Sequence, residues 1–401
     1  SPQNDPWPGW LFYAPVHFTP ANPFWKDFGT LNAYAARCQG FLQAGKSSND
    51  VLLYFPFTDR NNQPTSGRML PFSERNIQPS VRGMLHHYDG MEGFDGTSFN
   101  KSAEEMLELG YAWDLLSDRQ IQLLQVVNGK LKAPGGEYQT LVLSGVKYLP
   151  LTTLQKLVAL SKAGAQIIFH DGVPSTVPGL GNNASKQKQF NALIAAIKFK
   201  TTNAPGVNNA TSGKGKFWNG TEIKYLLANA NVRHEGYLAE EKLKCIRRKI
   251  AVGEYYFIIN DGKEKFDNWV LLNTELQNAV LFDPMTEKSG VANTRQGDAN
   301  TLDIYLQLAP GESCVVQTGA MKFAGTMFPY AKAAGDPINI SGYWKLKFLS
   351  GGPSLPKETT ISKLQSWTNL DIPGVKEFSG TAQYSISFNK PSINASSWLL
   401  N

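Results

Sequence analysis

The side chains of this 401-residue chain with the clearest chemical potential lie in one acidic, histidine-bearing stretch. His86 and His87 are followed by Asp89, Glu92 and Asp95. Imidazole and carboxylate groups at this density have the ligand chemistry of a divalent-ion site. Their spacing matches no metal-binding loop, however, and the Gly and Met residues among them favour a surface loop. We therefore predict no metal site in this chain.

Motifs for nucleophilic catalysis or phosphate binding are also missing from the sequence. Ser144 ends an apolar run, but a nucleophile elbow needs Gly-x-Ser-x-Gly, whereas this segment reads Leu-Val-Leu-Ser-Gly-Val. Gly213 to Lys216 lacks the spacing and the hydroxyl residue of a phosphate loop. Glycoside hydrolysis needs two carboxylates set apart across a sugar, and sequence spacing alone pairs none here. The residues by themselves identify no catalytic group.

Composition and charge exclude several classes of protein. The net charge of +6 is modest and no long basic run contains interleaved aromatics, so nucleic-acid binding is not expected. No apolar run reaches the roughly 18 residues of a membrane span. Cys38, Cys245 and Cys314 form no C-x-x-C pair, and a disulfide between Cys245 and Cys314 stays open. The basic patch from Lys242 to Lys249 alternates as the solvated face of a strand would.

The elements that must position any site begin with an apolar helix. Asn22 is a candidate N-cap and Pro23 a first helical residue. Apolar side chains then recur at steps of four and three, and Gly45 follows as a C′ residue; the stripe is Phe24, Phe28, Leu31, Ala35, Cys38 and Leu42. Nothing upstream receives this stripe, so we expect Phe24, Phe28, Leu31 and Ala35 to be unusually exposed or covered by another chain, whereas Cys38 should lie in the core.

The middle of the chain predicts an open α/β domain of flavodoxin type over residues 49–245. The continuous apolar run at 51–57 indicates a strand buried on both faces, and the segments TLVLSGV at 140–146 and AQIIFHD at 165–171 are predicted to be further buried strands. Helices are expected from near Ser102, from Thr152 to Gly164, over 187–200 and over 221–229, with a turn at Asn128-Gly129. Strand, helix and strand joined by short loops predict right-handed parallel crossovers.

Beyond residue 245, apolar residues recur at every second position. Alternating segments in 251–316, separated by Gly, Asn and Pro turns, predict an antiparallel β-sandwich over 246–332. A further β domain begins in 333–401. The fold class expected is therefore mixed, α/β plus all-β.

Several stretches resemble glycoside hydrolase family 106, the α-L-rhamnosidases. The segment PGWLFYAPVHFTPANPFWKDFGTLNAYAARCQGFLQAG is similar to the last loop and helix of that family's catalytic barrel. Further matching segments are Asp283-Pro284-Met285-Thr286, Ala309 to Ser313, Gly342-x-Trp344, Ser366-Trp367-Thr368 and Phe378 to Thr381. The resemblance assigns residues 1–48 to the end of a truncated TIM-type barrel and 333–401 to the beginning of a galactose-binding-like sandwich.

The resemblance implies the C-terminal part of an inverting hydrolase of terminal α-L-rhamnosides in plant or microbial polysaccharides. The family's catalytic carboxylates lie on earlier barrel strands and match no position here, so the chain alone should be inactive and would need a missing barrel domain. The complete enzyme would use calcium, with no cofactor in this chain. Active sites of such barrels lie among the loops after their strands, which makes Trp7 and Trp10 the candidate sugar-binding residues. We expect a periplasmic or extracellular location in a bacterium.

A second function from another class stays open. The chain would then be a non-catalytic carbohydrate-binding or scaffolding protein. The sandwich aromatics Trp344, Trp367 and Trp398 would stack on sugars, since the chain is rich in such rings, with nine Trp and fifteen Tyr.

Overall fold

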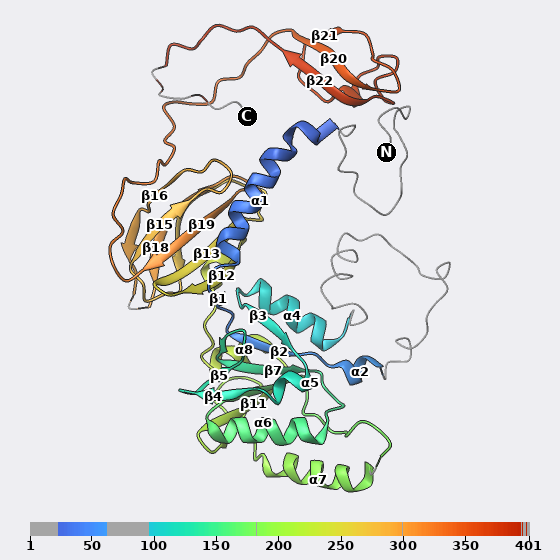
Figure 1. Cartoon of the computed structure of the whole chain (residues 1–401), viewed down its shortest axis with the longest axis vertical. Coiled ribbons are helices and arrows are strands. Elements are labelled where there is room, and N and C mark those ends of the chain that lie inside the picture. The colour runs from blue at the N-terminus through green and yellow to red at the C-terminus, as the bar shows by residue number, and fades with distance from the viewer. Residues whose placement is uncertain are drawn as a thin grey trace. The chain divides into compact units, whose positions relative to one another are not determined.

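The computed structural model describes residues 23–61, 96–181, 183–298, 300–393, 395 and 398. The chain divides into two compact units, one formed by Gly40–Pro329 and the other by Ser1–Gln39 together with Tyr330–Asn401. The fold is mixed α/β and contains several separate sheets, as expected (Figure 1).

A seven-stranded sheet forms the first half of the larger unit. Its strands follow the order β3-β2-β7-β8-β11-β10-β9, and the first five are mutually parallel. Taken in chain order, those five have the arrangement 2-1-3-4-5 that is common among doubly wound sheets. Their bounds are β2 (Val51–Tyr54), β3 (Trp113–Leu116), β7 (Thr140–Ser144), β8 (Gln166–His170), β9 (Lys200–Thr201), β10 (Asn208–Ser212) and β11 (Gly215–Gly220).

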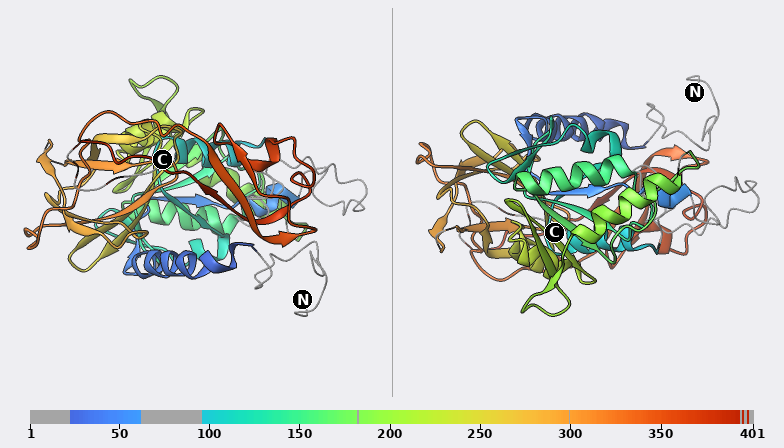
Figure 2. Two further views of the ribbon diagram at one scale, coloured as in Figure 1. Left: turned by 90° about the horizontal axis from the view of Figure 1, so that it is seen from above. Right: turned by 90° about the horizontal axis from the view of Figure 1, so that it is seen from below.

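Helices cover both faces of this sheet, which explains its continuous apolar strands. Leu52, Leu141 and Ile167 lie in one core, with helices α5 (Asp118–Ile121), α6 (Leu151–Ala163) and α7 (Asn183–Ala196). Val51 and Val142 lie in the opposite core, with α4 (Ser98–Glu108) and α8 (Ile223–Asn229). Figure 2 shows α6 and α7 side by side beneath the sheet.

Several helix starts differ from the sequence expectation. Helix α4 begins at Ser98 and not near Ser102, because Thr97 is the N-cap and accepts a hydrogen bond from the Asn100 amide at 3.3 Å. Helix α6 begins at Leu151, with Pro150 at the N-cap position and no side-chain cap. Helix α7 lies four residues earlier than expected at both ends.

Antiparallel strands make up the rest of the larger unit. A six-stranded sheet has the order β1-β12-β13-β19-β15-β16, and a three-stranded sheet the order β14-β18-β17. Alternate residues such as Tyr256, Ile258, Val270 and Ile304 are buried, which confirms the period of two. The strands are β1 (Lys46–Ser47), β12 (Leu243–Ile250), β13 (Gly253–Asn260), β14 (Phe266–Leu272), β15 (Asn278–Phe282), β16 (Ser289–Val291), β17 (Thr294–Gln296), β18 (Leu302–Leu308) and β19 (Ser313–Gly319).

Short elements complete the larger unit. Asn128 and Gly129 both have positive φ and form the predicted turn, within a small sheet of β4 (Gln125–Val127), β5 (Lys130–Lys132) and β6 (Glu137–Tyr138). Helix α2 (Phe57–Asn61) follows the parallel strand β2, and helix α9 (Gly236–Glu240) lies between α8 and β12.

The smaller unit contains a three-stranded sheet with its own core. Its strands are β20 (Trp344–Gly352), β21 (Thr359–Ile361) and β22 (Ser379–Ser385), and the 3₁₀ turn η3 (Trp367–Asn369) lies between β21 and β22. Leu346, Phe348 and Phe378 are buried together.

The predicted N-terminal helix exists, preceded by a 3₁₀ turn. Turn η1 (Pro23–Asp27) leads into α1 (Phe28–Leu42), which passes from the smaller unit into the larger one after Gln39. Phe24 is 38% exposed and Leu31 is 52% exposed, as expected, but Phe28 and Ala35 are half-buried, and Cys38 is buried as predicted. The predicted N-cap, Asn22, lies outside the described residues.

Candidate functional site

The carboxyl edge of a parallel sheet is where open α/β folds place ligands, so its side chains come first. Ser144 ends β7 and His170 ends the neighbouring strand β8, and the register places them opposite each other. The Ser144 Oγ lies 2.7 Å from the His170 Nδ1, and the His170 Nε2 lies 2.9 Å from the Thr221 carbonyl oxygen. This is the contact pattern of a serine aligned with an imidazole base.

Burial prevents this pair from acting on a substrate. Ser144 is only 1% exposed and His170 is also buried. Burial lowers the pKa of His170, so its neutral form is favoured at neutral pH. The neutral imidazole donates from Nε2 to the Thr221 carbonyl oxygen, and Nδ1 contacts the Ser144 hydroxyl, which also donates to the Ser98 carbonyl oxygen at 2.8 Å. The pair therefore joins the ends of two strands.

A second polar cluster lies at the same edge. Asp171 follows His170 with a φ of +56°, and its carboxylate accepts a hydrogen bond from the Ser98 hydroxyl at the start of α4. Asp59 accepts the backbone amides of Lys147 and Tyr148 at 3.0 and 3.2 Å. Burial raises the pKa of Asp59 although these amides oppose it. Each contact ties a loop to the sheet.

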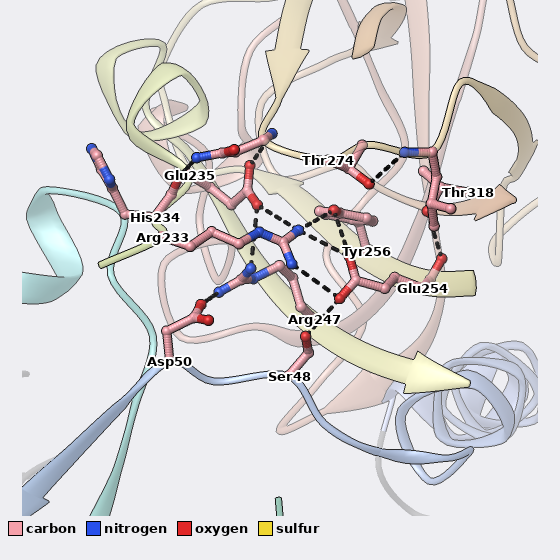
Figure 3. A network of polar contacts seen from close by, with 12 residues as sticks. Ser48, Asp50, Arg233, His234, Glu235, Arg247, Glu254, Tyr256, Thr274 and Thr318 are labelled. Carbon is pink, nitrogen blue, oxygen red and sulfur yellow. Dashed lines mark hydrogen bonds and ion pairs between the residues drawn. The ribbon is translucent and has the colours of Figure 1, made fainter. Parts of the chain in front are cut away.

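The densest polar network lies where the parallel-sheet region, residues 50–232, meets the antiparallel region, residues 243–319 (Figure 3). Arg247 of β12 pairs with Asp50, just before β2, and its Nη1 lies 3.5 Å from the Glu235 Oε1. Arg233 contacts Glu254 of β13 through two hydrogen bonds of 3.1 and 2.9 Å. We call these five charged residues the junction network.

Neutral groups complete the junction network. The Ser48 hydroxyl donates to Glu254 at 2.7 Å. The Tyr256 hydroxyl accepts from Arg233 at 2.6 Å and donates to Glu254 at 3.0 Å. The Asn273 backbone amide donates to the Glu235 Oε2 at 2.9 Å. Segments far apart in the sequence are thereby joined at one point.

The two glutamates have oppositely shifted pKa values. Burial raises the pKa of Glu235, against the charges of Arg247 and Arg233. Burial also opposes ionisation of Glu254, but the hydrogen bond and charge of Arg233 outweigh it and lower its pKa to about 2. Two arginines face three carboxylates, so a protonated Glu235 would leave the network neutral.

Divergent carboxyl pKa values characterise an acid and base pair in glycosidases. Geometry rules out that role here, because Glu235 is 1% exposed and both glutamates contact arginine. No sugar oxygen could approach either carboxylate without dismantling the network. The junction network connects the two regions through buried polar contacts.

The predicted sugar-binding residues Trp7 and Trp10 lie outside the described residues, as does the cluster from His86 to Asp95. Within the described ranges, no group of three His, Cys, Asp or Glu residues could hold a metal ion. The three cysteines are free, which settles the open disulfide between Cys245 and Cys314. Burial raises the pKa of both of these thiols to about 12.

The interpretation of the basic patch as a solvated strand face is wrong for Arg247. This residue is 1% exposed and lies in the junction network, whereas Lys244 and Lys249 are exposed. Alternation along β12 puts Leu243, Cys245 and Arg247 on one side, and the apolar Leu243 was the available signal that this side faces inward.

The aromatic residues of the carbohydrate-binding alternative have different surroundings. Trp367 packs edge-on against Phe348 and Phe378, with ring centroids 6.1 and 5.9 Å away. Trp344 is half-buried and Trp398 is 49% exposed. Trp367 is thus engaged in the core of the smaller unit.

Comparison with known proteins assigns a class to this architecture, in which a doubly wound sheet is joined to antiparallel sheets. The sequence profile of glycoside hydrolase family 106, described as alpha-L-rhamnosidase, matches residues 81–293, more than half of the chain. The chain therefore belongs to glycoside hydrolase family 106.

Two relatives are considerably longer than this chain. A rhamnosidase from Novosphingobium sp. PP1Y superposes with a TM-score of 0.61 at 21% identity, over 93% of this chain and 32% of that one. A putative beta-glucuronidase from Formosa agariphila is 26% identical over 263 residues, 63% of this chain and 18% of its own length. The chain spans less than a third of either relative, and the structural likeness shows the fold alone.

Within the described residues, no helix is both long and apolar enough to cross a lipid bilayer.

Proposed function

We propose that this chain is the C-terminal, non-catalytic part of an enzyme that hydrolyses terminal α-L-rhamnosides with inversion. Membership of family 106 is the observation on which the proposal rests. The substrates would be rhamnose-bearing plant or microbial polysaccharides. The location would be periplasmic or extracellular in a bacterium.

The junction network supports a structural role for the described residues. Among these residues, the two carboxylates with oppositely shifted pKa values are buried and paired with arginine. We therefore assign the catalytic acid and base to a barrel domain outside this chain. The complete enzyme would use a calcium ion, but the described residues offer no cluster to hold it, so we propose no ligand from them.

Residues 1–48 would be the last loop and helix of that barrel, and Trp7 and Trp10 would line its sugar pocket. Residues 49–245 would form a flavodoxin-like domain, residues 246–332 a β-sandwich and residues 333–401 the start of a galactose-binding-like sandwich. The exposed apolar side chains of α1, Phe24 and Leu31, support a neighbour for this helix.

Hydrolysis of p-nitrophenyl α-L-rhamnoside tests the proposal. The 401-residue chain alone should release no p-nitrophenol above background. The protein encoded by the longer reading frame should release it, and proton NMR of the first product should show inverted anomeric configuration. Turnover by the isolated chain, or a longer protein inactive on α-L-rhamnosides, would overturn the proposal.

A further inference from the structure

A groove of about 350 Å³ opens on the outward face of the six-stranded antiparallel sheet. It lies entirely within the larger unit, between the end of α1, strands β15, β16 and β19, and the segment 324–326. Its volume is at the lower end of the ~300–1,000 Å³ typical of ligand sites, which suits one small ring.

Strand register explains which side chains line the groove. Gln317 of β19 pairs with Val280 of β15, and Val280 pairs with Val291 of β16. Two residues along, Val315 pairs with Phe282, and Phe282 pairs with Ser289. Since directly paired residues point to the same face, these two rows place aliphatic, aromatic and polar groups side by side.

Phe41, from the last turn of α1, walls one side of the groove. Its ring centroid lies 5.0 Å from that of Phe282 and 5.2 Å from that of Tyr255. Phe41 and Phe282 remain half-buried, so their rings are partly open to the groove.

The opposite wall is fixed by backbone contacts. The Val291 amide donates to the Thr326 carbonyl oxygen at 2.8 Å, and the Phe328 amide donates to the Val291 carbonyl oxygen at 2.9 Å. Gly290 allows this approach, because a Cβ there would lie 2.5 Å from the Phe328 nitrogen. The groove is therefore pre-formed, which lowers the entropic cost of binding.

The lining contains hydroxyl and amide groups but no charged side chain. Gln317 presents its amide between Tyr255 and Val280, and it forms no side-chain hydrogen bond with another described residue. Ser289 and Thr326 add exposed hydroxyls at the rim. Such a lining disfavours phosphates and uronic acids, and it suits a neutral ligand with one apolar side and several hydroxyls.

We propose that this groove binds a single neutral 6-deoxyhexose unit, an L-rhamnosyl residue of a glycan. The C6 methyl group packs on the valines of the floor, the sugar ring lies against Phe282, and the hydroxyls meet Gln317 and Ser289. The sugar class follows from the lining, and the choice of rhamnose rests on the proposed function.

The test is a titration of the 401-residue chain with methyl α-L-rhamnoside, followed by saturation-transfer NMR. Binding in the millimolar range is expected for so small a ligand, with strongest saturation at the C6 methyl protons. Methyl α-L-mannoside is the matched ligand, because it differs only by a hydroxyl on C6. It should bind at least fivefold more weakly, since that hydroxyl would be buried against valine.

Two variants locate the binding site. Gln317→Leu removes the amide at similar volume and should weaken binding at least fivefold. Ser289→Trp, at an exposed position of the edge strand β16, should fill the groove and abolish binding. Gln307→Leu is the matched control, on β18 of the other sheet, and should leave binding unchanged. Circular dichroism melts confirm that each variant is folded.

Three results would overturn the proposal: no binding by the wild-type chain, equal binding of the two glycosides, or binding insensitive to both groove variants. A wild-type dimer that Ser289→Trp converts to a monomer, without sugar binding, would assign the groove to a second copy of the chain. Failure of this proposal can be distinguished from failure of the proposed function, because the proposed function is measured as hydrolysis by the longer protein.

Discussion

Arginine, carboxylate and tyrosine side chains cluster twice in the larger unit, in opposite surroundings. In the junction network, Arg247 and Tyr256 are buried with Asp50, Glu235 and Glu254. On the outward face of β14-β18-β17, Arg295 pairs with Asp303 at 2.8 Å and lies 3.7 Å from the centroid of the Trp269 ring. The Tyr305 hydroxyl there donates to Asp267 at 2.5 Å. We call this second group the outer cluster.

The raised tyrosine pKa values have different physical causes in the two clusters. Burial raises the pKa of Tyr256 well above its ordinary value, whereas the hydrogen bond to Asp267 raises that of Tyr305. Removing one partner from a buried network leaves an uncompensated charge in a poor solvent, but water replaces a lost partner at the surface. Surroundings, more than contact lists, determine the contribution of an ion pair.

The largest effect should come from Arg247→Met, which keeps the aliphatic volume and removes the charge. Asp50 would lose its ion-pair partner inside the junction, so we expect a loss of about 3–5 kcal/mol in the free energy of unfolding. Urea unfolding followed by tryptophan fluorescence measures this. Adding Asp50→Asn should recover part of the loss. If Arg247→Met alone lowers the free energy of unfolding by less than about 1 kcal/mol, the distinction between the two clusters is wrong.

The second test concerns the pH dependence of the Glu254 contribution. Its folded-state pKa of about 2 lies below the ordinary 4.5, so its stabilisation is present above about pH 4.5 and disappears as the pH falls toward 2. Integrated over that interval, the contribution is about 3 kcal/mol. The free energy of unfolding of Glu254→Gln should therefore be lower than that of the wild type at pH 6, and the two values should converge near pH 2. Parallel stability curves would contradict the assignment.

A backbone comparison tests how tightly the junction is packed. Gly110 has a φ of +81°, and a Cβ there would lie 2.4 Å from the Glu235 carbonyl oxygen, while Gly129 has a φ of +76° and open space. Both alanine variants incur backbone strain, but only Gly110→Ala also displaces the segment bearing Glu235. Its cost should exceed that of Gly129→Ala by about 1–3 kcal/mol, measured by thermal unfolding. If the two alanine variants lose the same free energy of unfolding, the segment bearing Glu235 can shift without loss of stability, and the junction is loosely packed.

The smallest effect should come from Arg295→Met in the outer cluster. Its guanidinium is more than half exposed and pairs with Asp303 in water, so a change of about 0.2–1 kcal/mol is expected. Adding 0.5 M salt should reduce the difference further, because exposed pairs are screened. A loss comparable to that of Arg247→Met would refute the contrast.

Strands β2, β7 and β8 of the parallel sheet were predictable because their signals are local, whereas β3, β9 and β10 were not predicted. Residues 141–143 and 167–169 are short continuous apolar runs, which are typical of strands covered on both sides. Helix starts were less predictable, since Thr97 and Ser102 are both acceptable caps and tertiary packing selects between them.

The junction network could not be predicted, because its charged residues come from four separate segments. Asp50 and Arg247 are 197 positions apart, and nothing near Arg247 in sequence distinguishes it from Arg248 except the alternation of β12. The pairing of Lys249 with Glu254 follows from a hairpin, but the approach of Arg233 depends on how two regions pack. Long-range register is the information that one sequence lacks.

The short strand β1 has a consequence for biosynthesis. Lys46 and Ser47 pair with Lys249 and Arg248, and the Ser48 hydroxyl reaches Glu254, 206 residues later. A ribosome adding about 5–20 residues per second would need roughly 10–40 s to supply those partners. The parallel sheet can therefore be complete on a nascent chain before Arg247, the ion-pair partner of Asp50, has been synthesised. A chain released before residue 247 would carry that carboxylate, without its arginine partner, at the edge of the parallel sheet.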